Sequence, residues 1–491
     1  MRRPISVAVD LGAESCRVSL LRWVDDEPRI DLVHRFPNIP ILESGKLRWN
    51  LRAITGGIKK GLRRSADLAS GARIASIGID GWAVDYVRLG VDGAPIADPY
   101  CYRDERTIKA EKEVYETISA ESLYRLTGIQ LLRLNTLFQL YADNYDGISQ
   151  STPWQNLPEY VTHWLGGERI AEYTNATHTQ LVALGKREWC TEIFEATGLN
   201  LRAAPCIAPA GTDIGCLRAD LLNSPSFHDT RLIVPACHDT ASAIAGIPLK
   251  GDDWAFISSG TWSLVGTVLD QPCATDEARG KNFTNLGGAG GKACFLKNVN
   301  GMWLLRQCME HWQSLGYRVT ISDLVDECAG LAPPDLPVDV DDSDLLLPGH
   351  MPDRINAQRK RLGFRPIPNG NLGSALMTNA IFHGLARRYA EVLSDVQAVV
   401  GKRLKRLCIV GGGSKNSLLN RLTAEFTGLN VVLGAAESST IGNFAVQLAT
   451  LSGECDPEVG AKSAAIARWA GVLSKSMDMS EAEVLTTVQK G

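Results

Sequence analysis

The stretch that decides the fold runs Ile5-Ser-Val-Ala-Val-Asp10-Leu-Gly12-Ala-Glu-Ser15-Cys-Arg17-Val-Ser-Leu20-Leu. An apolar run, a turn of small residues and a second apolar run predict two strands joined as a β-hairpin. The same order returns at Trp254-Ala-Phe-Ile-Ser258-Ser-Gly260-Thr261-Trp-Ser263-Leu-Val-Gly, about half of the 491-residue chain later. Two hairpin-led halves of similar length predict a duplicated α/β domain, whereas a solenoid would repeat every ~20 to 50 residues.

Strand-like and helix-like patterns alternate through the rest of the chain, which favours sheets covered by helices. Predicted strands cover residues 74–79, 406–410 and 431–433. Apolar residues from Met377 to Val396 recur every three or four positions. This spacing predicts one long helix over residues 375–399 with a single buried stripe.

The domain boundaries follow from these patterns. The first domain is expected at residues 1–247 and the second at 252–473, with residues 247–253 as the linker. Residues 331–365 contain five Pro and many charged residues, which predicts an irregular insertion.

The composition excludes several classes of protein. Charged residues make up 22% of the chain and the net charge is −4, so no broad positive field is available for a nucleic-acid backbone. The apolar runs are far shorter than the roughly 20 residues that cross a bilayer, and we expect neither a membrane span nor a secretion signal. The 12 Cys form no C-x-x-C pair, which is typical of reduced thiols, and we expect a cytoplasmic protein.

Three turns rich in Gly, Ser and Thr are candidate phosphate-binding loops: residues 10–17, 258–263 and 411–416. Small side chains let backbone N–H groups approach an anion, and hydroxyl groups add further donors. The third turn also precedes a predicted helix, whose N-terminus favours negative charge. An ordinary tight turn is the alternative for each one. Three such turns, two of them in corresponding positions of the two halves, favour phosphate binding.

Other motifs indicate different chemistry, but their spacing or context is wrong. Gly287-Gly-Ala-Gly-Gly-Lys292-Ala293 lacks the first Gly and the final Ser or Thr of a P-loop. Residues 288–293 fit a loose dinucleotide-binding pattern, which leaves a Rossmann oxidoreductase as a weak alternative, because the residues before them make a poor strand. Cys237, His238 and Asp239 are consecutive, and adjacent side chains diverge, so these three do not form a hydrolytic triad.

Asp239 and Asp80 each follow a predicted strand, at the edge where open α/β sheets bind ligands. Asp239 is either the N-cap of a helix or a carboxylate that orients and deprotonates a hydroxyl group. Two further residues follow Asp80 closely. Trp82 either stacks on a sugar or fills the core, and Asp85 either binds a hydroxyl or is solvated.

From about residue 5 to about residue 450, the chain resembles the FGGY family of carbohydrate kinases. The motifs that carry the resemblance are Asp10-Leu-Gly-Ala, Ile79 to Tyr86, Tyr102-Arg-Asp-x-Arg-Thr107, Gly260-Thr-Trp-Ser263 and Gly411 to Asn416. The resemblance implies two duplicated α/β domains with the actin/Hsp70-like (ribonuclease H-like) fold, and sugar and ATP in an inter-domain cleft. Further segments, such as 128–140, 173–177 and 295–305, are most similar to the branch that phosphorylates L-rhamnulose.

The resemblance also implies roles for the matching residues. Asp239 would accept the proton of the sugar hydroxyl, at the 1-position of L-rhamnulose, and Asp10 would hold Mg²⁺ through water. The expected sugar-binding residues are Ala83, Cys237, His238, Asp239 and Asn298. The expected contacts with ATP are Ala13, Glu14, Ser15, Cys16, Arg17, Thr261, Gly411 and Gly412. We expect a monomer or homodimer with no nucleic-acid or membrane partner.

The chain departs from the family pattern in two of the expected loops. Glu14 and Cys16 replace a Ser and a Gly, and Glu14 adds a negative charge beside the expected γ-phosphate. A sugar-binding pseudokinase is therefore the alternative outside catalysis. Ala83 stands at a usual Gly and Gly81 at a usual Ser or Thr, which leaves L-fuculose or another ketose as the alternative substrate.

Overall fold

The computed structural model describes residues 3–346, 349–475 and 484–485. The chain divides into two compact units. Unit 1 contains Met1–Lys250, Val268–Phe295 and Ser438–Ser480, and unit 2 contains Gly251–Thr267, Leu296–Glu437 and Glu481–Gly491. Residues 268–295 and 438–475 thus pack with unit 1, although they come after the start of the second half of the chain. The domain boundaries at 1–247 and 252–473 stay a prediction.

Unit 1 is built on a six-stranded sheet with the order β11-β12-β6-β1-β2-β3. In chain order its strands are β1 (Ile5–Leu11), β2 (Ser15–Val24), β3 (Glu27–Pro37), β6 (Ile74–Gly81), β11 (Asp213–Cys216) and β12 (Arg231–Ile233). β1 pairs antiparallel with β2, which confirms the predicted hairpin, and parallel with β6. In this register Asp10 lies beside Asp80 at the carboxyl ends of the two strands.

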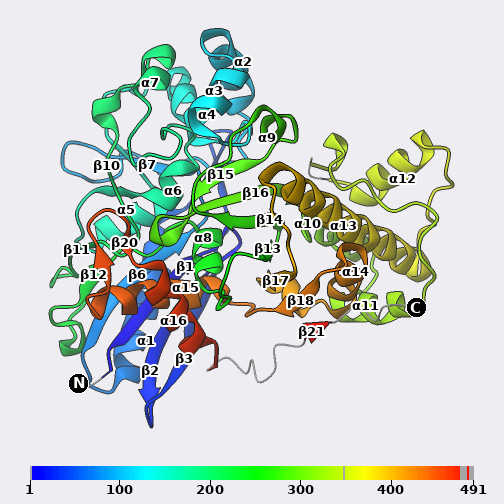
Figure 1. Ribbon diagram of the computed structural model, residues 1–491. Helices are drawn as coiled ribbons and strands as arrows, with labels where there is room; N and C mark the ends of the chain where they lie inside the picture. Colours follow the sequence, from blue (N-terminus) through cyan, green and yellow to red (C-terminus); the bar gives the residue numbers. More distant parts are fainter. Residues whose placement is uncertain (1–2, 347–348, 476–483, 486–491) are drawn as a thin grey trace. The chain divides into compact units, whose positions relative to one another are not determined.

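Helices cover the unit 1 sheet (Figure 1). α1 (Leu51–Ala69) packs on β1, β2 and β3, and α15 (Ser438–Leu451) packs on β1 and β6. Alternate residues of a strand point to opposite faces. Ile77 and Ile79 of β6 accordingly join the hydrophobic core that includes α1, whereas Gly78 faces α15.

The other elements of unit 1 are shorter. The helices are α2 (Thr107–Thr117), α3 (Ala120–Thr127), α4 (Thr136–Ala142), α5 (Leu157–Trp164), α6 (Tyr173–Thr177), α7 (Thr191–Thr197), α8 (Asp239–Ala245), α9 (Asp276–Gly280) and α16 (Ser463–Ser474). The strands are β4 (Ile41–Glu43), β5 (Lys46–Arg48), β7 (Tyr86–Arg88), β8 (Trp154–Asn156), β9 (Ile170–Glu172), β10 (Cys206–Ala208), β15 (Thr284–Gly287), β19 (Cys455–Asp456) and β20 (Gly460–Ala461).

Unit 2 repeats the hairpin-led arrangement. Its strands include β13 (Trp254–Ser259), β14 (Trp262–Leu269), β16 (Ala293–Asn300), β17 (Arg406–Val410), β18 (Asn430–Leu433) and β21 (Val484–Leu485). β13 pairs antiparallel with β14 and parallel with β17, and β17 pairs parallel with β18. β1, β2, β6 and β12 are paired in the same way. The predicted duplication of an α/β domain is therefore confirmed.

The helices of unit 2 confirm one prediction and correct another. They are α10 (Trp303–Ser314), α11 (Ile321–Ala329), α12 (Met351–Arg361), α13 (Asn371–Val400) and α14 (Ser417–Thr427). α13 confirms the long helix predicted over residues 375–399. The prediction that residues 331–365 are irregular is partly wrong, because α12 lies within them. Pro352 is in the first turn of α12, where the missing N–H of proline removes no helical hydrogen bond.

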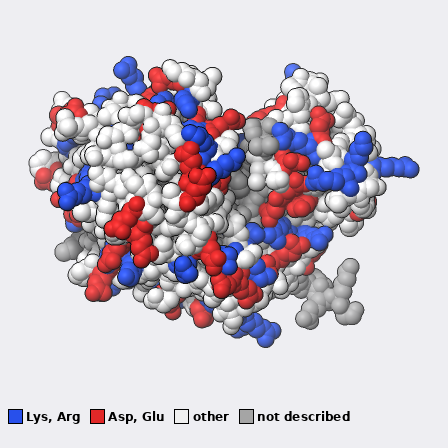
Figure 2. All heavy atoms as spheres, turned by 90° about the horizontal axis from the view of Figure 1, so that it is seen from above, with Lys and Arg blue, Asp and Glu red and all other residues white. Residues whose placement is uncertain are grey.

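The surface and the cysteines agree with the composition. Figure 2 shows Lys and Arg side chains interspersed with Asp and Glu over the visible face, and the sequence contains 51 Lys and Arg against 55 Asp and Glu. All 12 cysteines have free thiols. Among the described residues, no helix is both long and apolar enough to cross a membrane.

Candidate functional site

Three carboxylates of unit 1 lie at or beyond the carboxyl ends of neighbouring strands of the sheet. Asp10 is on β1, Asp80 is on β6, and Asp239 follows β12 as the first residue of α8. His238 takes the N-cap position of α8, so the interpretation of Asp239 as the N-cap is wrong. Asp80 is completely buried, whereas the Asp239 side chain keeps 37% of its surface exposed. Asp239 is therefore the most exposed of the three carboxylates.

The environment of Asp239 suits it to proton transfer. Loss of hydration raises the pKa of Asp239 to about 7, and the charge of Asp10 adds to this shift. Burial, followed by the charge of Asp10, raises the pKa of Asp80 well above its usual value. A carboxyl group that titrates near neutral pH is partly ionised there, which favours its use as a general base.

Helix α15 presents polar side chains to Asp10 and Asp80. Ser439 Oγ donates to Asp10 Oδ2 at 2.8 Å, and Asn443 Nδ2 donates to Asp80 Oδ2 at 2.5 Å. One turn further on, Gln447 Nε2 donates to Asn443 Oδ1 at 2.6 Å. Residues four apart share one face of a helix, so α15 forms a polar stripe that begins at the carboxyl ends of β1 and β6 and runs back along both strands to Val7 and Ser76.

A glycine allows α15 to lie this close to the sheet. A Cβ atom on Gly78 would come within 2.5 Å of Asn443 Oδ1 and 2.7 Å of Gln447 Nε2. These polar contacts between α15 and the sheet were not predicted from the sequence. The signal was present as polar residues spaced by four, Ser439, Asn443 and Gln447, in an otherwise largely apolar segment.

A second pair of carboxylates fixes the loop that precedes Asp239. Glu172 Oε2 accepts from the Cys237 N–H at 2.9 Å and from the Thr174 hydroxyl at 2.5 Å. Thr174 Oγ1 in turn accepts from the His238 N–H at 3.3 Å. Burial raises the pKa of Glu172 to about 7 and that of Glu159, which accepts from the Glu172 N–H, to about 8. Sequence reasoning also missed these two positioning residues.

The structure brings Cys237 and His238 to the turn after β6. The Gly81 N–H donates to the Cys237 carbonyl at 2.9 Å, and Gly81 forms a parallel bridge with His238. The Cys237 thiol is buried against the Ile79 carbonyl, and burial raises its pKa well above the ordinary value. His238 Nε2 lies 3.3 Å from Asp239 Oδ1. These residues therefore form one group in unit 1.

The same turn carries backbone strain. Ala83 is buried, and the next residue, Val84, has a φ of 70°, which is rare for a β-branched residue. The Val84 carbonyl accepts from Thr136 Oγ1 at 2.8 Å and from Gln139 Nε2 at 3.2 Å, and these bonds hold the conformation. Strained backbone of this kind clusters at ligand sites.

Trp82 and Asp85 have structural roles. The Trp82 ring packs against Trp49 in the unit 1 core, with ring centroids 4.6 Å apart. Asp85 is completely buried and accepts from Trp49 Nε1 at 2.6 Å and Trp82 Nε1 at 2.9 Å. Trp82 therefore fills the core, and Asp85 joins two indoles rather than facing solvent.

The side chains of the turn between β1 and β2 differ in exposure, and not all of them face a ligand. The Glu14 side chain is exposed, and the Glu14 backbone carbonyl accepts from the Asn38 N–H at 2.9 Å. Asn38 Nδ2 also donates to the Gly12 carbonyl at 3.0 Å. Cys16 is completely buried in the core, and burial raises the pKa of its thiol to about 12, so that side chain does not face a ligand. Ala13, Ser15 and Arg17 are half-buried.

The remaining candidate residues belong to unit 2, namely Thr261, Asn298, Gly411 and Gly412. The turns after β13 and β17 follow neighbouring parallel strands, and they touch: a Cβ atom on Gly411, whose φ is 83°, would lie 2.7 Å from the Ser259 carbonyl oxygen. Apart from the residues of its own turn, no described heavy atom lies within 4 Å of a Cβ position on Gly412. Gly412 thus offers open space beside its backbone, as a nucleotide contact requires.

The described residues contain no group of three or more His, Cys, Asp or Glu side chains that could hold a metal ion. Mg²⁺ usually takes only one or two carboxylates, together with water and substrate phosphates. Asp10 fits this mode, and the Asp80 Oδ1 atom beside it is buried without a hydrogen-bond partner in the described chain.

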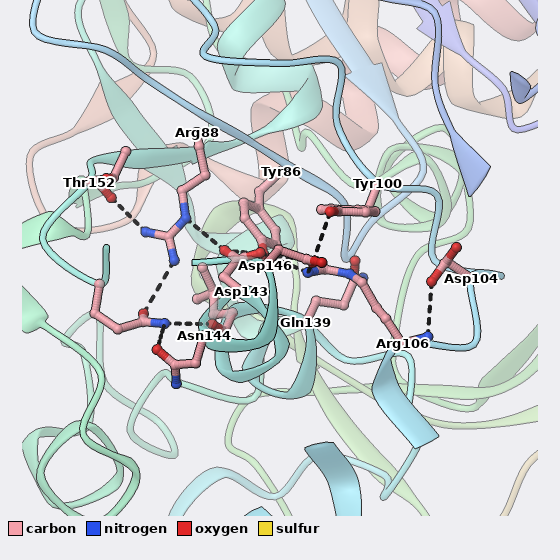
Figure 3. A network of polar contacts seen from close by, with 12 residues as sticks. Tyr86, Arg88, Tyr100, Asp104, Arg106, Gln139, Asp143, Asn144, Asp146 and Thr152 are labelled. Atoms are coloured by element: carbon pink, nitrogen blue, oxygen red, sulfur yellow. Dashed lines mark hydrogen bonds and ion pairs between the residues drawn. The ribbon is translucent and has the colours of Figure 1, made fainter. Parts of the chain in front are cut away.

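Figure 3 shows a second buried polar network in unit 1, centred on Asp143. Asp143 accepts from Arg88 Nε at 2.8 Å, from Arg106 Nη1 at 2.7 Å and from the Tyr86 hydroxyl at 2.8 Å. The Arg88, Arg106 and Asp143 side chains are at most 5% exposed. Arg106 belongs to the motif Tyr102-Arg-Asp-x-Arg-Thr107, and here it is a structural residue.

Comparisons with known proteins agree on one family. The model of the N-terminal domain of the FGGY family of carbohydrate kinases matches residues 5–246, and that of the C-terminal domain matches residues 255–451. The rhamnulokinase of Ligilactobacillus salivarius is 35% identical over 444 residues, which cover 90% of each chain. The rhamnulokinase of an Enterobacter species is 36% identical over 91% of this chain and 89% of its own. A xylulose kinase structure from Lactobacillus acidophilus, 15% identical, matches 96% of this chain and 97% of its own with a TM-score of 0.73, and therefore shares the fold.

Proposed function

The chain belongs to the FGGY family of carbohydrate kinases, and we propose that it transfers the γ-phosphoryl group of ATP to the 1-hydroxyl of L-rhamnulose. It is a carbohydrate kinase with two α/β domains of the actin/Hsp70-like type, and the family implies ATP as the phosphoryl donor. The observation that carries the choice of sugar is the 35% identity over 90% of both chains with a curated rhamnulokinase. The cytoplasmic location and the monomeric or homodimeric state stay predictions.

In the proposed reaction, Asp239 is the general base. The sugar hydroxyl gives its proton to the Asp239 carboxylate as the hydroxyl oxygen bonds to the γ-phosphorus. The bond between this phosphorus and the bridging oxygen of ATP breaks, and ADP leaves. Phosphoryl transfer needs mainly positioning and charge stabilisation from the protein. Ala83, Cys237 and His238 would position the sugar beside Asp239, and the assignment of Asn298 to the sugar rests on the family resemblance.

The phosphates would be held by backbone and by charge. The residues proposed for ATP are Ala13, Glu14, Ser15, Cys16, Arg17, Thr261, Gly411 and Gly412. Mg²⁺, when bound, neutralises charge on the phosphate oxygens. Asp10 would hold the ion through water, and its carboxylate is oriented by Arg17 Nη2 and Ser439 Oγ, each 2.8 Å from Asp10 Oδ2.

One observation favours another ketose, such as L-fuculose, as the second candidate. A Cβ atom on Gly81 would lie 2.7 Å from Leu11 Cβ and 2.9 Å from the Leu11 carbonyl oxygen. A Ser or Thr side chain at this position would therefore push the turn away from β1. This chain has Gly81 where the family turn usually has Ser or Thr, and Ala83 where it usually has Gly. Its turn therefore lacks the hydroxyl group and differs in shape from the usual family turn.

A panel of ketoses separates these possibilities. The purified protein is incubated with Mg-ATP and each sugar, and both ADP and the phosphorylated sugar are measured. We expect preferential turnover of L-rhamnulose. Preferential turnover of L-fuculose or another ketose would contradict the proposed sugar and leave the kinase assignment in place. Sugar binding without turnover of any ketose would indicate a pseudokinase.

The rate of the reaction should depend on pH through Asp239. A general base acts in its ionised form, and the raised pKa of Asp239, about 7, means that protons block it below neutral pH. The kcat/KM for the sugar is therefore expected to rise with pH through about 7 and then to level off. A pH–rate profile at saturating Mg-ATP measures this. An acid limb near pH 4, the ordinary range of an aspartate, would show that the pKa of the general base is not raised in this site.

A further inference from the structure

The turn after β6 has two backbone N–H groups without a partner in the chain. Ala83 is 8% exposed and Val84 is 5% exposed. Neither the Ala83 N–H nor the Val84 N–H donates a hydrogen bond to another described residue. Nearly all buried N–H groups in proteins are paired, because an unpaired one loses its hydration without compensation. Two adjacent unpaired N–H groups therefore indicate a place where the acceptors come from outside the chain.

The backbone of this turn needs external support. Val84 has a φ of 70°, in the left-handed region that a β-branched residue rarely adopts. A strained conformation of this kind persists only where the surrounding structure fixes it. Groups outside the turn must therefore hold Val84 in place.

Helix α4 supplies the hydrogen bonds that do so. Thr136 Oγ1 donates to the Val84 carbonyl at 2.8 Å, and Gln139 Nε2 donates to the same carbonyl at 3.2 Å. Both side chains are buried. Residues three apart share one face of a helix, so the two donors reach the carbonyl from the same side of α4. A carbonyl oxygen has two lone pairs and can accept both bonds.

The start of α4 is itself fixed to other segments of unit 1. Asn135, at the N-cap, uses its side-chain amide to donate to the Gln130 carbonyl at 3.0 Å and to Gln180 Oε1 at 2.9 Å. These contacts belong to the segment 128–140, one of those in which the chain resembles the L-rhamnulose branch of the family. The segment therefore has a structural task in unit 1, namely to support the turn after β6.

A fixed Val84 carbonyl also fixes the direction of the Val84 N–H. Peptide groups are planar, so the backbone dihedrals set how one peptide group is turned against the next. The Val84 N–H and the Val84 carbonyl belong to successive peptide groups, which φ and ψ of Val84 relate. If the carbonyl were released, Val84 could relax to an ordinary negative φ, and the N–H would rotate out of its present direction.

We propose that Thr136 and Gln139 are positioning residues, which hold the turn at Val84 so that the N–H groups of Ala83 and Val84 donate to the ketose. The inference deepens the proposed function and rests on it for the sugar contact at Ala83. A sugar hydroxyl is a suitable acceptor, because its oxygen carries two lone pairs. Thr136 and Gln139 are buried and have no contact with the sugar, so they act through the Val84 carbonyl.

Two substitutions at Thr136 separate the donor from the shape of the side chain. Thr136→Val keeps the shape and removes the hydroxyl group, whereas Thr136→Ser keeps the hydroxyl group. We expect Thr136→Val to raise the KM for the ketose that the panel identifies by about three- to tenfold, the effect of one lost neutral hydrogen bond. The KM for ATP and kcat should stay close to the parent values. Thr136→Ser should keep the parent KM for the ketose.

The matched control is Thr197→Val on α7. Thr197 is also buried, and its Oγ1 donates at 2.6 Å to the Ile193 carbonyl of its own helix. This variant should lose some stability in thermal unfolding but keep the parent KM for the ketose. A parent KM for the ketose in folded Thr136→Val, or an equal rise of the KM for ATP, would overturn the proposal. If Thr136→Val does not fold, Gln139→Met removes the other donor, and its KM for the ketose decides in the same way.

Hydrogen exchange measured by mass spectrometry tests the support of the turn without sugar or turnover. We expect the segment 82–86 to exchange faster in Thr136→Val than in the parent protein, and at the parent rate in Thr136→Ser and Thr197→Val. Unchanged exchange in Thr136→Val would refute the inference. If the parent protein turned over no ketose, the proposed function would be contradicted instead, and the exchange rates would still decide whether α4 holds the turn.

Discussion

An Asp239→Asn variant is expected to lower kcat by 10²- to 10⁴-fold, the range typical of a lost general base. Asn has nearly the same shape as Asp and still accepts a hydrogen bond, so sugar affinity should stay close to that of the parent. Asp239 keeps 37% of its side-chain surface exposed, so loss of its charge should change the stability of the folded protein only slightly. Steady-state kinetics gives kcat, and calorimetry of sugar binding gives Kd.

The matched control is Asp276→Asn in the first turn of α9. Asp276 also starts a helix, and its side chain is 92% exposed, so the same change of charge should leave kcat unaltered. If Asp239→Asn retained a kcat within tenfold of the parent value, Asp239 would be an ordinary residue of the first turn of α8. A large rise in Kd with unchanged kcat would instead make it a sugar ligand.

The elements that the sequence predicts well are those whose evidence is local. The hairpins at Ile5 and Trp254 and the helix over residues 375–399 follow from periodicities that a few neighbouring residues determine. Asp239 could also be predicted as a candidate site residue, because a strand end and a run of small residues flank it. Its N-cap role was predicted wrongly because helix boundaries shift by one residue on details of the backbone.

The supporting residues of the site depend on contacts between distant segments. Asn443 bonds Asp80 across 363 positions of sequence, and Cys237 bonds Glu172 across 65. Local sequence patterns do not indicate hydrogen-bond partners that are so far apart in the chain. Burial is equally hard to read from sequence. Cys16 lies in a phosphate-loop motif, and its side chain nevertheless points into the core because alternate residues of β2 face α1.

Replacing Asp143 by Ala is expected to destabilise unit 1 by about 3–5 kcal/mol, the cost of removing one partner from a buried ion pair. The substitution leaves the Arg88 guanidinium group buried without its carboxylate, leaves Arg106 with only the more distant Asp146 at 3.7 Å, and removes the acceptor of the Tyr86 hydroxyl. Urea unfolding measures the loss as a lower midpoint. Tryptophan fluorescence is a suitable probe, because Trp154 packs against Tyr86 with ring centroids 6.0 Å apart.

A control on a nearby helix separates buried from exposed ion pairs. Lys109→Gln breaks the pair with Glu113 on α2, and because the Lys109 side chain is 69% exposed we expect a change below about 0.5 kcal/mol. An equally small loss for Asp143→Ala would mean that water reaches the two guanidinium groups.

The same network gives a test of whether Arg106 takes part in nucleotide binding. Since Asp143 holds Arg106, an Arg106→Lys variant that stays folded should be less stable and keep the parent KM for ATP. A raised KM for ATP at unchanged stability would instead place Arg106 in the nucleotide site.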